Sequence, residues 1–500
     1  MMNNGAVYPL TILLSSLIPG LLIFFLPERM SGLRTVLNLA GALLKVAVVG
    51  LILWGVYNGE RYEAALPFLP GLPLLLRVDP LSLLFVTLST SLWLATTIYA
   101  IGYLEGSPNR SRFFGFYSLC VSATVGIAMA GNLVTLLVFY ELLTVTTYPL
   151  VVHRGSAAAR SAGAVYLGFT IGGGVALLAG VVWAEALAGP IDFAGARGAL
   201  DDVDTRHDMA LVIIFILLVG GFGVKAALVP LHQWLPRAMV APAPVSALLH
   251  AVAVVKAGAF GIARVVYDVY GTGLAERLEL TPALAVLAGA TILYGSLRAL
   301  NQDDLKRRLA FSTISQVSYI TLGVALFSPL AGVGGLVHLV HQGLMKITLF
   351  LCAGNLAETL GIHKVSEMDG AGRRMPWTMA AFSVAALGMI GLPPMAGFIS
   401  KWFLGVGAIQ AGAPWALAVL IASSLLNAAY FLPILHRAWF RPIAGPWPEE
   451  QHFSRFETKL SLLLPALATA GATVAAGLLA GMAGSPLGWI RTVVATEYPL

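Results

Sequence analysis

The side chains best suited to take part in chemistry are ionisable groups that lie in sequence otherwise apolar enough to cross a membrane. One acid, four lysines and three histidines have this setting: Glu141, Lys225, Lys256, Lys346, Lys401, His250, His338 and His341. A charge at bilayer depth costs roughly 2.5–3.5 kcal/mol on insertion scales. Because the chain accepts this cost repeatedly, we infer that these residues have a function. Passing protons along a polar path inside the membrane is the predicted chemistry.

The elements that must position these residues are membrane-spanning helices. The sequence is 58% hydrophobic and 11% charged, whereas soluble proteins are about 25% charged. This composition predicts an all-α polytopic membrane protein with no separate soluble domain. Apolar runs of about 20 residues, the length that crosses the hydrocarbon core, recur along the chain. We count fourteen predicted spans: 8–26, 35–57, 80–104, 113–130, 133–152, 161–186, 209–229, 243–267, 281–299, 309–328, 333–357, 377–410, 414–436 and 460–482.

The cysteine content argues against redox chemistry in this chain. Cys120 and Cys352 are far apart in sequence, and there is no CxxC motif. Two thiols cannot hold an iron–sulfur cluster of the usual four-cysteine kind. We therefore expect no cofactor in this chain and assign any electron transfer to a partner. The first apolar run has no basic leader and no small-residue cleavage site, which predicts a retained span.

The loop charges predict an orientation. With the N-terminus outside, most loop Lys and Arg residues fall on the cytoplasmic side, among them Lys306-Arg307-Arg308 and Arg373-Arg374. This asymmetry follows the positive-inside rule and places both termini outside a bacterial-type cytoplasmic (inner) membrane. No pattern indicates nucleic-acid binding, so the lipid bilayer is the expected environment.

Prolines interrupt two of the predicted spans. Pro230 lies five residues after Lys225, and the Pro393-Pro394 pair ends seven residues before Lys401. Proline removes a backbone donor and opens a helix. Open backbone is tolerated at membrane depth only where it is buried in protein or lines a wet cavity. Structural kinks are the alternative, but a lysine beside both breaks favours a transport site.

The two breaks also suggest an internal repeat. They fall in the seventh and twelfth spans, which cross the membrane in opposite directions. This spacing predicts two inverted five-helix repeats with broken helices at matching positions. The predicted divisions are 1–110 for helices 1–3, 111–270 for the first repeat (helices 4–8), 271–440 for the second (helices 9–13), and 441–500 for helix 14 and the tail.

Glu141 is the only carboxylate near the centre of a predicted span. An ionised carboxylate in hydrocarbon needs a cation nearby, so the buried lysines are its candidate partners. Such a pair is either a switchable element or a static ion pair that fixes helix packing. Lys225, close to the cytoplasmic end of its span, could instead extend to the interface. Lys256, at mid-span, is poorly placed to do so.

The histidines extend the candidate path. His250 precedes Lys256 by six residues, about 9 Å along a helix axis, which leaves room for one bridging group. His338 and His341 are three residues apart and share a helix face. Their HxxH spacing lacks a nearby carboxylate and is not a metalloprotease motif. Proton exchange is therefore preferred to a metal site, and a structural role for one of the two is the alternative.

The last part of the predicted path leads toward the outer half of the membrane. Lys346 follows the two histidines on the eleventh span, and Lys401 is the predicted final station. Lys45, in the second span, is a weaker candidate because it lies outside the repeats. The tenth span has a polar stripe that could hold water: Ser312, Thr313, Ser315, Gln316 and Ser318.

Together these segments resemble the proton-conducting membrane subunits shared by respiratory complex I and the Mrp multisubunit sodium/proton antiporters. The resemblance covers roughly residues 75–440 and rests on motifs in the same order along the chain. They are Asp79-Pro-Leu-Ser, Glu141, Lys225 with Pro-Leu-His-Gln-Trp-Leu-Pro, Pro244-Val-Ser-Ala-Leu-Leu-His, Asp304-Leu-Lys-Arg-Arg-Leu-Ala-Phe-Ser-Thr-Ile-Ser-Gln, the His341 to Lys346 segment, and Leu392-Pro-Pro-Met-Ala-Gly-Phe.

The resemblance implies a fourteen-helix core with two inverted repeats and a central hydrophilic axis. In that axis Glu141 pairs with Lys225. Lys256 and the eleventh-span residues relay protons, and Lys401 serves the outer half-channel.

Finer details point to different relatives. A lysine at position 401 resembles the Mrp D subunit and two of the three antiporter-like subunits of complex I. Ser246-Ala-Leu-Leu-His250 resembles the largest of those subunits and the Mrp A subunit. Gln342 stands where many relatives place a histidine, and His341 is the candidate substitute.

Three functions follow as alternatives. The first is a proton-translocating subunit of a multisubunit complex, most like the D subunit of an Mrp-type cation/proton antiporter. The second is an antiporter-like subunit of a complex I-type NADH:quinone oxidoreductase or a membrane-bound hydrogenase. The third is an independent secondary transporter. The expected partners are other membrane subunits and protons, with Na⁺ or another monovalent cation as a further candidate, and the chain is not expected to be catalytic by itself.

Overall fold

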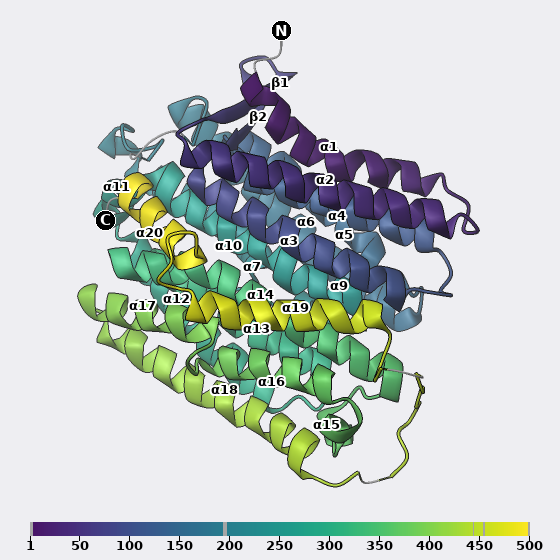
Figure 1. Ribbon diagram of the computed structural model, residues 1–500. Coiled ribbons are helices and arrows are strands. Elements are labelled where there is room, and N and C mark those ends of the chain that lie inside the picture. The colour runs from purple at the N-terminus through teal and green to yellow at the C-terminus, as the bar shows by residue number, and fades with distance from the viewer. Residues whose placement is uncertain (1–3, 194–197, 444, 454–455, 499–500) are drawn as a thin grey trace.

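Long helices lie side by side through most of the chain (Figure 1). The computed structural model describes residues 4–193, 198–443, 445–453 and 456–498. In hydrocarbon each backbone amide needs an internal partner, and a helix supplies one within the segment itself. In Figure 1, α1 and α2 form one edge of the bundle and α18 forms the opposite edge.

The elements follow the chain in three groups. Up to the first break they are α1 (Asn4–Phe24), α2 (Ser31–Tyr57), β1 (Tyr62–Leu69), β2 (Leu72–Val78), α3 (Pro80–Tyr103), α4 (Arg110–Ala128), α5 (Leu133–Val151), α6 (Ala157–Ala188), η1 (Thr205–His207) and α7 (Asp208–Ala226). Between the breaks they are α8 (Trp234–Arg237), η2 (Ala238–Val240), α9 (Ala243–Ala247), η3 (Leu248–Val252), α10 (Val254–Arg264), η4 (Val265–Tyr270), α11 (Gly271–Arg277), α12 (Leu280–Leu300), α13 (Leu305–Ala325), α14 (Pro329–Leu360), η5 (Val365–Glu367), α15 (Ala371–Arg374) and α16 (Pro376–Ile390). After the second break they are α17 (Ala396–Gln410), α18 (Pro414–Phe440), α19 (Leu460–Leu478) and α20 (Pro486–Glu497).

Within the described residues, eleven helical segments are long and apolar enough to cross a membrane. The chain is therefore a multi-pass membrane protein, as its composition predicts. The fourth, tenth and twelfth predicted spans are not among the eleven. The helices α4 and α13 are continuous but carry many hydroxyl-bearing and charged side chains, and the twelfth span is divided between α16 and α17.

The fold is mostly helical, as predicted, with one element that the prediction did not include: a β-hairpin joins α2 to α3. Strands β1 and β2 pair antiparallel, with Tyr62 opposite Val78, and Gly71 at the turn has φ +77°. The hairpin also contacts the start of α5, where the Leu75 amide donates to the Thr135 hydroxyl at 2.8 Å. Asn132 caps the same helix by accepting from the Thr135 amide at 2.8 Å. The hairpin and the cap thus fix the helix that carries the predicted acid.

The first helix break begins before its proline. Helix α7 ends at Ala226, four residues ahead of Pro230, because Ala227 adopts the left-handed conformation with φ +57°. The carbonyl of Val224 accepts from the capping amide of Ala227 at 3.1 Å and also from the Trp234 indole at 2.7 Å. Lys225 consequently lies in the last turn of α7 and is fully buried.

The second break separates α16 from α17. Helix α16 ends at Ile390, and Gly391 has φ +98°, a conformation that favours glycine. Helix α17 starts at Ala396, so Pro393 and Pro394 lie in the open segment. Both breaks contain a cis peptide bond, at Val229-Pro230 and Pro393-Pro394.

The eighth predicted span has an irregularity that no proline announces. Between α9 and α10 the chain forms a π-helical turn, η3, with His250 at its centre. Ala253, which joins η3 to α10, departs from helical geometry with φ −115° and ψ −86°. Because such π turns are often found at functional sites, this irregularity supports a functional role for the neighbouring His250 and Lys256.

Helix α10 crosses α7 at a glycine. A Cβ on Gly258 would lie 2.1 Å from the Ala226 amide nitrogen and 2.7 Å from the Phe222 carbonyl oxygen. A rotamer change cannot relieve contacts with backbone, so this close approach requires glycine. Gly258 therefore holds the helix of Lys256 against the last turn of α7, which carries Lys225.

We predict that Gly258→Ala destabilises the detergent-solubilised protein by about 1–3 kcal/mol, the usual effect of overpacking. The matched control is Gly220→Ala in α7, where an added Cβ meets nothing within 4 Å. That variant is expected to be neutral or slightly stabilising. Thermal unfolding followed by tryptophan fluorescence compares the two, and equal melting temperatures would contradict the argument from packing.

Candidate functional site

Glu141 and Lys225 lie at the start of the candidate path, but they do not form the predicted ion pair. No contact within 4 Å joins their charged groups in the described part of the chain. The Lys225 ammonium instead donates to the Tyr140 carbonyl and lies 3.3 Å from the centroid of the Tyr140 ring. The Lys225 ammonium therefore contacts the backbone and the ring of Tyr140 where a contact with the Glu141 carboxylate was expected.

The Glu141 side chain packs against α6. A Cβ on Gly174 would lie 2.4 Å from Oε1 of Glu141, so glycine makes room for the carboxylate. That Oε1 atom is buried and has no hydrogen-bond partner among the described residues. The acid and Lys225 still interact electrostatically. The pair is therefore poised close together without a direct hydrogen bond.

Lys256 ties the interrupted eighth span to α14. Its ammonium, fully buried, donates to the Leu339 carbonyl at 2.7 Å. His250, on the π-helical turn, stacks on Phe350 of α14 with ring centroids 4.4 Å apart. Both of these contacts are with α14, the helix that carries His338, His341 and Lys346. Helix α14 therefore connects His250 and Lys256 with the later residues of the path.

Several polar atoms beside α14 are buried without a protein partner. In the described structure neither ring nitrogen of His250, neither ring nitrogen of His341 and neither amide atom of Gln342 makes a hydrogen bond. Leaving such a group unpaired costs about 1–3 kcal/mol. Ordered water is the usual partner for buried polar groups of this kind. We infer that this segment of the path is hydrated.

His338 connects three helices. Its Nδ1 lies 2.7 Å from the Ser400 hydroxyl on α17, and its Nε2 lies 3.1 Å from Oε1 of Gln316 on α13. His341, one turn along α14, lies near the backbone of Ala396 at the start of α17. The two histidines thus face the same broken span, yet only His338 has side-chain partners among the described residues.

From Lys346 onward the polar groups form an unbroken line. The Lys346 ammonium donates to the Ser312 hydroxyl at 2.6 Å, and the same hydroxyl lies 2.8 Å from the Tyr430 hydroxyl, to which it can donate its own proton. Tyr430 donates to Oδ1 of Asn427. The Asn427 amide reaches the Met389 carbonyl at 3.0 Å.

Lys401 completes the line on the other side of that carbonyl. Its ammonium donates to the carbonyls of Met389 and Ile390 and to the Ser424 hydroxyl, each at 2.9 Å. Both carbonyls belong to the last turn of α16, where the break leaves them without helical partners. Lys401 is therefore held by backbone that the second break exposes.

Sequence reasoning missed Tyr430 and Asn427, which bridge Lys346 and Lys401. Both are fully buried on α18. A usable signal was present, because Ser423, Asn427 and Tyr430 recur at three- to four-residue spacing and so share one face of an apolar helix. The polar stripe predicted on the tenth span faces this line through Ser312.

A second buried charged group escaped the prediction as well. Arg264 of α10 is 1% exposed and forms ion pairs with Asp79, at the N-terminus of α3, and with Asp268 of η4. Its guanidinium also donates to the Ser82 hydroxyl at 2.8 Å. This cluster joins the hairpin-proximal end of α3 to the eighth span, with two carboxylates sharing one guanidinium.

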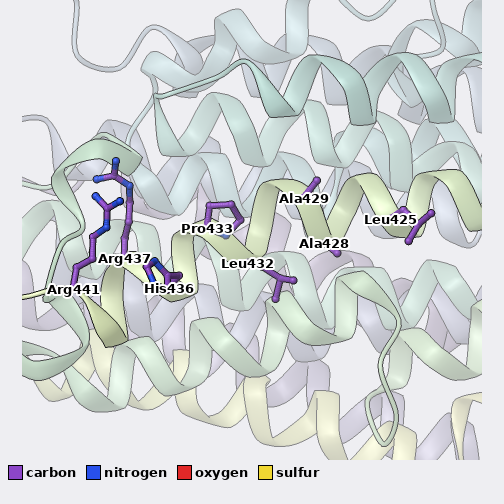
Figure 2. A pocket seen from close by; sticks show the side chains of 8 residues that line it. All are labelled: Leu425, Ala428, Ala429, Leu432, Pro433, His436, Arg437 and Arg441. Carbon is purple, nitrogen blue, oxygen red and sulfur yellow. The ribbon is translucent and has the colours of Figure 1, made fainter.

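One open groove lies apart from the line of polar groups. Its volume is about 560 Å³. Figure 2 shows the lining side chains along α18, with His436, Arg437 and Arg441 at one end. Asp369 pairs with both arginines, at 3.0 and 3.5 Å. The remaining lining is mostly apolar, so the groove offers little unpaired charge to a transported ion.

Two family models match parts of this chain. Residues 130–427 match the family described as NADH:quinone oxidoreductase/Mrp antiporter, TM. Residues 71–114 match the family described as NADH-Ubiquinone oxidoreductase (complex I), chain 5 N-terminus.

Individual relatives come from both branches of this family. The N subunit of the NADH-quinone oxidoreductase of Desulforudis audaxviator is 37% identical over 417 residues, which cover 80% of this chain and 81% of that protein. The D subunit of the Na(+)/H(+) antiporter of Alkalihalophilus pseudofirmus is 26% identical over 491 residues, which cover 96% of this chain and 94% of that protein.

The fold has a solved counterpart. A chain in the structure of the Mrp complex from Dietzia sp. DQ12-45-1b superposes with a TM-score of 0.86 at 23% identity, covering 100% of this chain and 98% of that chain. Since the first family match alone spans more than half of the sequence, the chain belongs to the NADH:quinone oxidoreductase/Mrp antiporter family of membrane subunits.

Proposed function

We propose that this chain is a proton-translocating subunit of a multisubunit membrane complex, most like the D subunit of an Mrp-type monovalent cation/proton antiporter. The unbroken line from Lys346 through Ser312, Tyr430 and Asn427 to the carbonyl that also holds Lys401 is the observation that carries the proposal. It connects the amines of Lys346 and Lys401 by hydrogen bonds, with the hydroxyls of Ser312 and Tyr430 able both to accept and to donate protons and the Met389 carbonyl accepting from both sides. The Mrp relatives are antiporter subunits, which supports coupling of this path to another cation.

The proposal includes a fourteen-span architecture with two inverted repeats. Helices α4 and α13 and the divided pair α16–α17 would complete the eleven apolar spans. The first repeat would then run from α4 to the eighth span and the second from α12 to α18. Supporting this, both repeats contain one broken span with an associated lysine. Both termini would lie outside the cytoplasmic membrane of a bacterial-type cell.

In this mechanism Glu141, Lys225, Lys256, His250, His338, His341, Lys346 and Lys401 form the proton relay. The buried lysines bond to carbonyls and hydroxyls, so no carboxylate fixes the proton on any of them within the described structure. Transfer from one amine to the next moves a single positive charge along the line. Glu141 and Lys225, which are separated in this structure, would form an ion pair when the protonation of other relay residues favours it. This change would couple the Glu141–Lys225 end of the relay to its Lys401 end.

The main alternative is an antiporter-like subunit of a complex I-type NADH:quinone oxidoreductase or a membrane-bound hydrogenase. The 37% identity to the N subunit of an oxidoreductase favours this interpretation. The proton path would be the same, but a redox partner would drive it. Isolation of the native complex decides between them, because co-purifying flavin and iron–sulfur proteins indicate the redox pump. Small membrane proteins alone indicate the antiporter, and transport of an organic solute by the isolated chain would contradict both.

We predict that Lys225→Ala lowers coupled proton transport by the assembled complex at least tenfold, equivalent to about 1.4 kcal/mol. Glu141→Ala has the same expected effect, because either change removes a charge that the start of the relay requires. Proteoliposomes with an internal pH dye report the rate. The matched control is Arg61→Ala, which removes an exposed cation, and near-normal transport in Lys225→Ala would count decisively against the relay.

A second prediction addresses the bridge between Lys346 and Lys401. Tyr430→Phe removes only the hydroxyl that joins Ser312 to Asn427, so proton transport should fall roughly tenfold while the complex still assembles. Tyr294→Phe is the matched control, since that ring packs edge-on against His232 and its hydroxyl is not part of the line. Unchanged rates in both variants would show that protons do not pass through Tyr430.

A further inference from the structure

Lys45 of α2 is another fully buried lysine, and it lies outside the proton relay. Its ammonium donates to the Ser16 hydroxyl of α1 at 2.6 Å and lies 4.6 Å from the Trp93 ring centroid on α3. Among the described residues, no carboxylate lies within ion-pair distance of it. A buried ammonium without a paired anion is costly to keep charged, so this amine is disposed to exchange its proton.

A line of buried polar groups leads away from Lys45. The Ser16 hydroxyl lies 2.7 Å from that of Ser122 on α4. The Ser122 hydroxyl donates to the backbone carbonyl of Ser118, one turn earlier on α4, at 3.0 Å, and the Ser118 hydroxyl donates to Oδ1 of Asn38 at 3.3 Å. The Asn38 amide in turn donates to the Arg34 carbonyl at 2.9 Å. All of these side chains are at most 4% exposed.

The line ends at a charged cluster on the surface. The Arg34 guanidinium donates to the Ser111 hydroxyl at 2.8 Å and lies 3.6 Å from the Glu28 carboxylate. Glu28 is exposed, accepts from the Ser111 amide at 2.9 Å, and lies 3.5 Å from Arg110. The polar groups therefore extend from solvent at Glu28 into the bundle as far as Lys45.

On its other side Lys45 faces α3, several of whose polar atoms have no protein partner. Thr90 Oγ1, Trp93 Nε1 and Thr97 Oγ1 are buried without hydrogen bonds in the described structure. Their spacing of three and four residues places them on one face of α3. Helix α3 packs against α2 and also against η3, which carries His250.

Helix packing alone does not require this arrangement. Serine hydroxyls at the α1–α4 contact are sufficient to join two membrane helices. A lysine at the end of the line adds the cost of a buried charge and gains no ion pair among the described residues. Its presence is explained if the amine binds and releases a proton.

We propose that Lys45 is a proton-binding site outside the relay, a second site of proton entry that is supplied from the Glu28 surface along Ser118, Ser122 and Ser16. It exchanges protons with the His250–Lys256 part of the relay across α3. A proton taken from water at the surface converts the Lys45 amine to an ammonium, which returns to the amine when it passes that proton on. This inference rests on the proposed function, because it adds an entry to that relay.

Substitutions at Lys45 test proton exchange separately from charge and volume. Lys45→Met keeps much of the side-chain volume without a charge, and Lys45→Arg keeps a charge that does not leave. Both should lower proton transport by the reconstituted complex at least threefold. If either variant transports at the wild-type rate while assembled, the amine of Lys45 does not need to exchange a proton, and the proposal fails.

Ser122→Ala tests the line without touching Lys45. It should also lower transport, whereas Ser15→Ala should not, because the Ser15 hydroxyl bonds to its own helix at Ile12. Equal rates in Ser122→Ala and Ser15→Ala would overturn the supply route. Lys225→Ala, measured in the same preparation, distinguishes failure of the relay from failure of the Lys45 site. Normal transport by Lys225→Ala would contradict the relay itself. An inactive Lys225→Ala beside a fully active Lys45→Met contradicts only the second site.

Discussion

The structure depends on how a lysine ammonium is held inside a membrane without a carboxylate. Lys225, Lys256 and Lys401 each donate to a backbone carbonyl, and Lys346 donates to both a carbonyl and a hydroxyl. A buried carboxylate would bind the charge strongly and would itself cost solvation energy. A neutral carbonyl stabilises the ammonium less, so the proton is held without being trapped. The proposed release of protons by these lysines depends on their having carbonyl and hydroxyl acceptors as partners.

The second helix interruption makes such partners available to Lys401, whereas Lys225, Lys256 and Lys346 donate to carbonyls inside the continuous helices α5, α14 and α13. Regular helices use their carbonyls internally, so spare acceptors arise mainly where a helix ends. The last turn of α16 presents Met389 and Ile390 to Lys401 in this way. At the first break an indole or a hydroxyl bonds to the backbone, as Trp234 does to the Val224 carbonyl and Thr291 does to the Val229 amide. Glycine at the α7–α10 crossing then keeps these irregular segments tightly packed.

The sequence showed which ionisable residues fall within the long apolar helices, because a charged side chain in an apolar run is conspicuous. It also indicated the two proline breaks within a few residues. It did not predict the β-hairpin, whose two strands fall in a segment taken for a loop, or the π-helical turn at His250, which no proline marks. The direct contact predicted between Lys225 and Glu141 is absent from the described structure, where Lys225 donates to a backbone carbonyl that no sequence pattern marks. Tyr430 and Asn427 were missed because a few polar residues on one face of an apolar helix also occur where membrane helices simply pack together.

The central claim is that the buried lysines bind and release protons instead of remaining permanently charged. Solid-state ¹⁵N NMR of the assembled complex, with lysine side chains labelled in this chain alone, measures this directly. We predict that part of the lysine signal is a neutral amine whose fraction changes with pH, and that Lys346→Met removes one such component. Ammonium signals alone at every pH at which the complex transports would contradict the account.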